Sequence, residues 1–283
     1  MLTEFRNTLR RSWGAILGWG LSLGALGFFM MGFYDTLEDQ RAMLEQLIAQ
    51  YPPELMAFFG GNGTANLFTP AGYLTMEFFS LMPVVLGIFG VMAGSGLLAG
   101  DEENGLLDLV MAYPVSRSNL FFGRLLGFAV TLAAILGLTW LAFVAGIGTT
   151  SMDVTAVELV RPFVSLYAIV FLFGGLSLCL SMALPSRGMA GMLGGVLMVA
   201  SYFIQSLSTL NESLEKVAEY LPLRYYQSGY AIEGLNSDWA WLLGFGLLFT
   251  ALAWALFLRR DIRVSGEGNW RFGFAKIVFK KPA

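Results

Sequence analysis

The sequence is short of the residues that most catalytic and metal sites need. Its 283 residues include no histidine and a single cysteine, Cys179. Such a chain cannot form a histidine-containing metal site, a Cys-x-x-Cys pair, an internal disulfide or a histidine-dependent nucleophilic triad. We therefore expect this chain to carry no catalytic residue and no metal ligands.

Charged residues are also scarce. They make up 13% of the chain, against about 25% in ordinary soluble domains. Hydrophobic residues make up 56% and a further 34 residues are glycine, a composition that indicates a membrane protein. The 17 Lys and Arg residues nearly balance the 20 Asp and Glu residues, so the formal net charge is -3. Because nucleic-acid binding needs clustered cations, we expect no nucleic-acid partner.

The chain lacks a P-loop for ATP. That motif needs a Gly-Lys pair followed by Ser or Thr, so that backbone amides and the lysine ammonium can hold the phosphates. None of the four lysines follows a glycine: they are Lys216, Lys276, Lys280 and Lys281. We expect no cofactor on this chain, and any ATP hydrolysis must occur on a partner subunit.

Apolar runs free of charge are the most prominent feature that the sequence does contain. A helix needs about 20 residues to cross roughly 30 Å of hydrocarbon, and six runs are long enough. We predict an all-α polytopic membrane protein with six transmembrane helices, in one domain over residues 1–263 with a basic tail over 264–283. The predicted spans cover about residues 13–34, 78–100, 125–149, 163–184, 188–211 and 239–258.

Cations divide unequally between the two ends of these spans. With the N-terminus in the cytoplasm, the inner side holds Arg6, Arg10, Arg11, Arg117, Arg124, Arg187 and the cations of residues 259–281. The outer side holds only Arg41, Arg161, Lys216 and Arg224. Since cytoplasmic flanks carry the excess of Lys and Arg, we predict a multi-pass plasma-membrane protein with both termini in the cytoplasm.

Two long outer loops follow from this topology, over residues 35–77 and 212–238. In the first, Leu37, Leu44, Ile48 and Tyr51 repeat at helical spacing before Pro52 and Pro53. This pattern predicts a short amphipathic helix at the outer surface. It would be either a lid packed on the spans or a substrate gate.

The inner loop between the second and third spans, residues 101–117, is the most informative. Three acids open it and a proline closes it. Acidic residues suit the positive end of a helix dipole, so we expect a short helix from Glu102 to Ala112. Leu106, Leu109, Val110 and Tyr113 would share one face of it. Such a helix would either dock in a groove of a soluble partner or form a solvated turn.

The same loop resembles that of ABC transporter type-2 permeases, the membrane subunits of ATP-binding cassette exporters. The matching residues are Glu102-Glu103, Gly105, Leu107-Asp108, Leu109 and Pro114-Val115-Ser116-Arg117. One residue departs, because Leu106 stands where the family often has Thr. The resemblance implies a cytoplasmic coupling helix seated on a separate ATPase subunit, which would hold ATP and Mg²⁺, in a complex of two permease chains and two ATPases.

The resemblance also implies roles for individual residues. Coupling to the ATPase would fall to Asp101, Glu102, Glu103, Gly105, Leu107, Asp108, Leu109, Tyr113, Pro114 and Arg117. Arg117 and Arg124 would anchor the loop at the lipid headgroups. The first residues of the chain resemble an interfacial elbow helix, with Arg6, Arg10, Arg11 and Trp13 at the membrane surface. A plain topology signal would fit that stretch equally well.

Close helix packing is indicated by glycines four residues apart. Gly90 and Gly94, Gly96 and Gly100, and Gly191 and Gly195 would serve contacts within one subunit or a seam between two. In the family resembled, the second and fifth spans line the pathway. By that resemblance, the following residues would line the pathway: Phe78, Phe79, Phe89, Tyr202, Phe203 and Gln205. These residues suit a lipophilic or amphipathic cargo, although they could equally face lipid.

The sequence thus predicts a permease subunit that exports a hydrophobic or amphipathic compound, such as a drug, an antibiotic or a lipid-like molecule. It would have as partners an ATP-binding cassette ATPase, a second permease chain, identical or similar, and membrane lipids. A membrane scaffold or sensor subunit without transport activity, or a passive channel, is the alternative.

Overall fold

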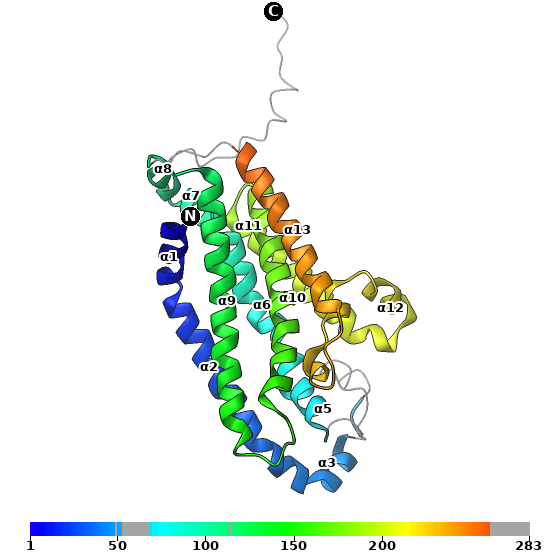
Figure 1. Ribbon diagram of the computed structural model, residues 1–283. Helices are drawn as coiled ribbons and strands as arrows, with labels where there is room; N and C mark the ends of the chain where they lie inside the picture. Colours follow the sequence, from blue (N-terminus) through cyan, green and yellow to red (C-terminus); the bar gives the residue numbers. More distant parts are fainter. Residues whose placement is uncertain (49, 53–67, 114, 261–283) are drawn as a thin grey trace, which may run out of the picture.

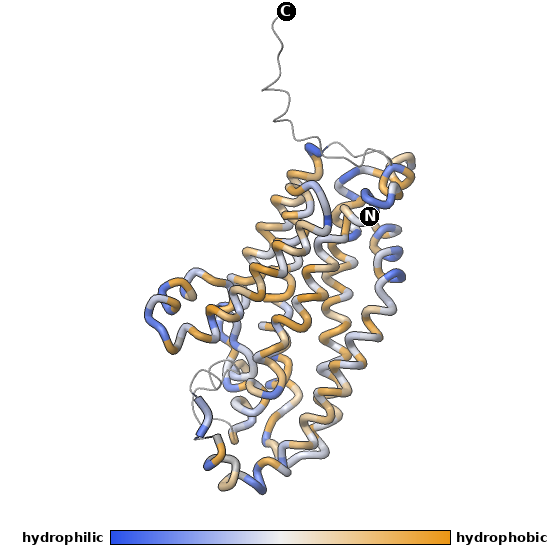
Figure 2. Tube along the Cα trace, turned by 180° about the vertical axis from the view of Figure 1, so that it is seen from behind, coloured by the Kyte–Doolittle hydropathy of each residue, from blue (hydrophilic) through white to orange (hydrophobic). Residues whose placement is uncertain are grey.

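The computed structural model describes residues 1–48, 50–52, 68–113 and 115–260, and these residues form an elongated bundle of helices (Figure 1). Within those ranges the chain contains no strand. The expectation of an all-α polytopic membrane protein is therefore confirmed. Hydropathy agrees, because apolar residues fill the middle of the bundle and polar residues gather toward its two ends (Figure 2).

Five of the described helices are long and apolar enough to cross a membrane. They are α2 (Trp13–Asp39), α9 (Arg117–Ile147), α10 (Ala156–Ala183), α11 (Arg187–Leu207) and α13 (Asp238–Arg259). Two further pieces, Pro70–Phe79 and Met82–Gly96, are long and apolar enough only together and meet at a bend of 43°, so they form either a broken sixth span or a re-entrant loop. The second piece is α6, and the first comprises α5 (Pro70–Leu74) and the π-helix η2 (Thr75–Phe79).

Shorter helices connect the spans at the two ends. At the end that holds the N-terminus lie α1 (Leu2–Arg11), α7 (Ala99–Glu103) and α8 (Leu106–Met111). Away from that end lie α3 (Arg41–Ile48), η3 (Ser208–Leu210), α12 (Glu212–Ala218), η4 (Pro222–Tyr225) and η5 (Ser228–Ile232). The amphipathic helix expected in the first outer loop corresponds to α3, and Pro53 lies outside the described residues.

Helix α10 forms the centre of the bundle. It packs against α6, α9, α11 and α13, and it is the most buried of the apolar helices. A helix that is apolar on every side can be covered by lipid or by other helices, and α10 is covered mainly by its four neighbours. Its first turn is fixed by a capping box, in which Thr155 and Glu158 exchange hydrogen bonds.

The glycine pairs make contacts within the subunit. Gly90 and Gly94 of α6 face Val170 and Gly174 of α10, and the two backbones approach closely there. Gly191 faces Ser95, whereas Gly195 has open space beside it. Small residues allow helices to approach at such positions, so the α6–α10 contact depends on the missing side chains.

A methyl group on Gly94 is therefore expected to destabilise the bundle. In Gly94→Ala the new Cβ would overlap the carbonyl oxygen of Gly174, a backbone atom that cannot rotate away. We expect a loss of about 1–3 kcal/mol, the usual cost of overpacking. The matched control is Gly195→Ala, which meets no atom within 4 Å. Thermal unfolding of both variants in detergent tests this, and equal melting temperatures would contradict it.

Candidate functional site

The loop between α6 and α9, which was expected to hold one helix, contains two short helices. The single helix expected from Glu102 to Ala112 is wrong, because α7 ends at Glu103 and α8 begins at Leu106. Gly105 stands between them with a φ angle of 67°, in the left-handed region that favours glycine. The glycine thus ends one helix and turns the chain into the next.

Helix α8 is held to the bundle on one side and open on the other. Leu107 is 1% exposed and joins the hydrophobic core, whereas Leu109 is 64% and Tyr113 is 71% exposed. Asp108 is half-buried. Pro114 lies outside the described residues. Of the predicted coupling residues, Leu109 and Tyr113 are thus available to a partner, and Leu107 anchors the helix beneath them.

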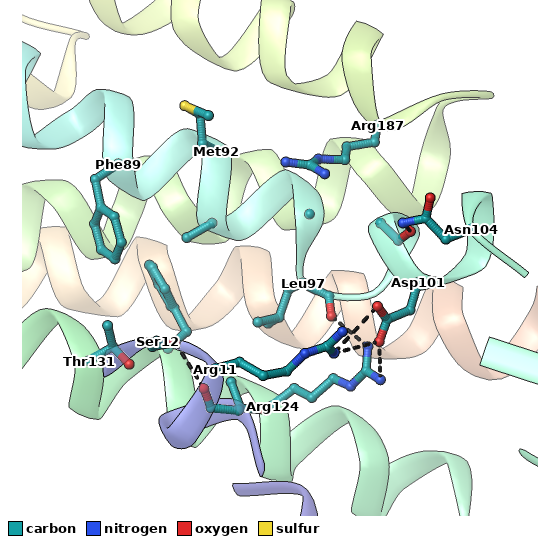
Figure 3. Close-up of a pocket in the computed structure, with 15 residues that line it drawn as sticks. Arg11, Ser12, Phe89, Met92, Leu97, Asp101, Asn104, Arg124, Thr131 and Arg187 are labelled. Carbon is teal, nitrogen blue, oxygen red and sulfur yellow. Dashed lines mark hydrogen bonds and ion pairs between the residues drawn. The ribbon is translucent and has the colours of Figure 1, made fainter. Parts of the chain in front are cut away.

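The acid that opens the loop binds two arginines of the chain itself. Asp101 Oδ2 accepts a hydrogen bond from Arg124 Nη2 at 2.7 Å and lies 3.2 Å from Arg11 Nη1 (Figure 3). Arg124 also donates to the carbonyl oxygen of Leu97 at 2.9 Å, and its Nε lies 3.8 Å from Glu4 Oε2. This cluster joins α1, α7 and α9 at one point.

Arg124 therefore does not anchor the loop at the headgroups, and that expectation is wrong. Its side chain is 5% exposed. Beside it, α1 packs on α9 over Gly123, whose missing side chain makes room for the backbone oxygen of Met1. The helix α1 covers the arginine, and a reading of the sequence could not place that helix there.

The next two acids are also engaged within the chain. Glu102 is 8% exposed, and its Oε2 lies 3.3 Å from Arg260 Nη2. Glu103 is exposed, and its Oε1 accepts a hydrogen bond from the backbone amide of Arg187 at 2.6 Å. Helix α7 is thus tied to the first residue of α11 and to the end of α13, in addition to α1 and α9.

Arginines close the inner ends of two spans. Arg117 Nη1 donates to the carbonyl oxygens of Phe257 at 3.2 Å and Arg260 at 2.7 Å, at the end of α13. Arg260 Nη1 donates to the carbonyl oxygens of Ser181 and Met182 at 2.8 and 3.0 Å, at the end of α10. A cation at a helix C-terminus satisfies carbonyls that have no partner in the helix. Arg117 therefore caps the end of α13, and its expected position at the headgroups stays a prediction.

The N-terminal helix α1 lies along α9 at the same end of the bundle (Figure 1). Arg6, Arg10 and Arg11 are exposed, and so is Trp13 at the start of α2. Thr8 faces Gly127 of α9. One side of α1 is thus packed, while its arginines remain on the outside.

The predicted pathway residues fall into separate groups. Phe78 and Phe79 are buried in one aromatic cluster with Phe143 and Phe163. The remaining four lie elsewhere. Phe89 contacts the rings of Trp19 and Phe128, Tyr202 is buried, Phe203 is 46% exposed, and Gln205 has a buried Oε1 without a hydrogen-bond partner among the described residues.

The π-helix η2 is a feature that the sequence reading missed. It carries Glu77, an exposed acid directly before the run that was read as the second span. The π-helical turn and the bend that follows it are frequent at functional sites. Pro70 and Pro83, which flank this region at helix starts, were the available signal. Among the described residues, no group of three carboxylate or cysteine side chains could hold a metal.

The ion-pair cluster around Asp101 generates a stability prediction. Arg124→Gln leaves a largely buried carboxylate with one exposed partner, and we expect a loss of about 3–5 kcal/mol, as for other broken buried pairs. Arg11→Gln is the control, because that side chain is 57% exposed and an exposed pair contributes at most about 1 kcal/mol. Thermal unfolding of the full chain in detergent measures both, and a larger loss in Arg11→Gln would refute the assignment.

Known proteins agree with this architecture. A curated relative, the probable ABC transporter permease protein NosY of Pseudomonas aeruginosa, is 27% identical over 140 residues, which are 47% of this chain and 48% of the relative. The chain therefore spans about half the length of that relative. A family model described as ABC-2 family transporter protein matches residues 1–262. This multi-pass membrane chain, with its apolar bundle and its two short inner helices, belongs to the ABC-2 transporter family.

Proposed function

We propose that this chain is the permease subunit of an ABC transporter that exports a hydrophobic or amphipathic compound. A second permease chain, identical or similar, would enclose the pathway with it. A separate ATP-binding cassette ATPase would hold ATP and Mg²⁺ and drive the cycle. The observation that carries this proposal is the α7–α8 segment, which is tied to the bundle by α7 and exposes apolar side chains on α8.

The exposed side of α8 suits a groove in a soluble partner. Leu106, Leu109 and Tyr113 are exposed together at the tip of the bundle, where a lone chain gains nothing from exposing them. Asp108 adds a half-exposed carboxylate beside them. An apolar anchor with a polar edge is typical of a helix that docks in a groove. We assign the coupling contact to this side of α8.

When the ATPase moves α8, the acids of α7 would transmit that movement to the spans rather than contact the ATPase themselves. Asp101 joins α7 to α1 and α9, and Glu102 joins it to the end of α13. A push on α8 would therefore act on several spans at once. We therefore assign Asp101 and Glu102 to the transmission of movement, and Leu109 and Tyr113 to the contact with the ATPase.

The charge distribution supports an inner, cytoplasmic position for α7 and α8 in the plasma membrane. Arginines gather at that end, where Arg6, Arg10 and Arg11 lie on α1 and Arg117 begins α9. Cytoplasmic flanks carry the excess of cations in most membrane proteins. Both termini would then be cytoplasmic.

Changing the exposed side of α8 should uncouple the chain from its ATPase. We expect Leu109→Asp with Tyr113→Ser to leave insertion and melting temperature unchanged and to weaken ATPase binding about thirtyfold, as for loss of about 2 kcal/mol at an interface. Tyr220→Ser is the control, because Tyr220 is 88% exposed and follows α12, which lies away from α8 (Figure 1). Co-purification and ATP turnover in reconstituted vesicles measure the effect.

Unchanged turnover in the α8 variant would reject the coupling role. If no ATPase co-purifies with the unmodified chain, the permease assignment itself fails, and a scaffold, a sensor subunit or a passive channel would take its place.

The proposed orientation can be tested separately with single cysteines. After Cys179→Ala, a membrane-impermeant maleimide should label Tyr220→Cys in intact cells. It should label Leu109→Cys only after permeabilisation, because the two positions would lie on opposite sides of the membrane. Labelling of Leu109→Cys in intact cells would invert the topology.

A further inference from the structure

A cavity of about 520 Å³ opens beside the inner half of α6. Its wall is shared by four parts of the chain, namely the junction of α1 and α2, the end of α6 with α7, the inner half of α9, and the first residue of α11. The residues that line the cavity are drawn in Figure 3. The cavity lies next to the ion-pair cluster but is not filled by it.

Three arginines and one acid line this cavity, so its wall carries an excess of positive charge. Arg124 is already matched by Asp101 at 2.7 Å and Glu4 at 3.8 Å. Arg11 shares the carboxylate of Asp101 from an exposed position. The guanidinium of Arg187 has neither a hydrogen bond nor an ion pair within the described part of the chain.

The side chain of Arg187 lies against the backbone of α6 and α7, where two glycines leave room for it. A Cβ atom on Gly96 would lie 3.0 Å from Arg187 Nε, and one on Gly100 would lie 3.4 Å from Arg187 Nη1. Any side chain at Gly96 would push the guanidinium aside. The carboxylate of Glu103 accepts a hydrogen bond from the backbone amide of Arg187 and, among the described residues, forms no ion pair with its guanidinium.

The other half of the cavity is apolar. Phe89, Met92 and Phe128 line it. Phe89 lies at the end away from Asp101 and Arg124, and Met92 lies between Phe89 and Arg187 (Figure 3). Thr131 lies in the same part, is 2% exposed, and has a buried hydroxyl with no hydrogen-bond partner among the described residues. The cavity therefore has a cationic end toward α7 and an apolar end toward the middle of the bundle.

We propose that this cavity binds an anionic amphiphile, with the anionic headgroup between Arg11 and Arg187 and the apolar part along Phe89 and Met92. Guanidinium groups recognise phosphate and carboxylate by charge-assisted hydrogen bonds. A zwitterionic lipid also carries a phosphate, but its quaternary ammonium would be repelled by the same cationic wall, and a small inorganic anion leaves the apolar half unused. The inference deepens the proposed function, because it gives the amphipathic compound a negative headgroup.

Binding can be measured without any ATPase. The full chain in neutral detergent is titrated with an equal mixture of phosphatidylglycerol and phosphatidylcholine of the same acyl chains, and the retained lipids are counted by native mass spectrometry. We expect phosphatidylglycerol to be preferred, and Arg187→Gln or Arg11→Gln to reduce that preference roughly tenfold, the effect of one charge-assisted hydrogen bond.

Two further variants separate the site from general surface charge. Arg259→Gln removes an exposed cation from the same end of the bundle without touching the cavity, so the preference should stay. Gly100→Leu fills the cavity without changing any charge, so the preference should fall. Melting temperatures verify that each variant is folded. An equal fall in Arg259→Gln, or no fall in Arg187→Gln, would overturn the proposal.

Two further experiments complete the test: a competition with the headgroup alone, and a transport assay. Glycerol phosphate that displaces the lipid at an equal concentration would overturn the amphiphile assignment, because the apolar half would contribute nothing. In vesicles with the ATPase and ATP, movement of labelled phosphatidylglycerol to the opposite leaflet identifies a cargo, and retention without movement identifies a resident lipid. Either supports the site. Failure of ATPase coupling leaves the binding arm intact, so the two proposals fail separately.

Discussion

The inner end of the bundle depends on the contact between Asp101 and Arg124. Their atoms meet at 2.7 Å with both side chains largely buried, and the same arginine holds the carbonyl oxygen of Leu97. Two buried charges are tolerated together because each reduces the desolvation cost of the other, while either one alone would be strongly destabilising. The pair therefore fixes α7 against α9.

Arginines at this end of the bundle cap helices and form ion pairs, in addition to any role in setting the topology. Arg117 closes the end of α13, and Arg260 closes the end of α10 while it also pairs with Glu102. A membrane helix that ends near the interface has carbonyl groups without partners, and a guanidinium can bind several of them at once. One residue type thus serves as helix cap, ion-pair partner and cavity wall within a short distance.

The sequence predicted the features that arise from local pattern. Apolar runs indicated the six spans, and the glycine spacing indicated close packing, because both depend on neighbours along one helix. Gly105 is among the residues that match the family, yet the local pattern does not reveal the left-handed backbone with which it breaks the expected helix. The burial of Glu102 and Arg124 could not be predicted, since their surroundings come from α13 and α1, which are far away in sequence.

Helix α7 belongs to both proposed sites, and this shared position has a mechanical consequence. Its Asp101 binds Arg11 beside the cavity, and its far end leads through Gly105 into the exposed side of α8. A movement of α8 would shift Asp101 relative to Arg11 and change how much of that guanidinium is available to an anion. Coupling between two sites is reciprocal, so an anion that draws Arg11 away from Asp101 would also alter how α8 sits on its partner. The ion-pair cluster is the element through which the two proposed sites would influence each other.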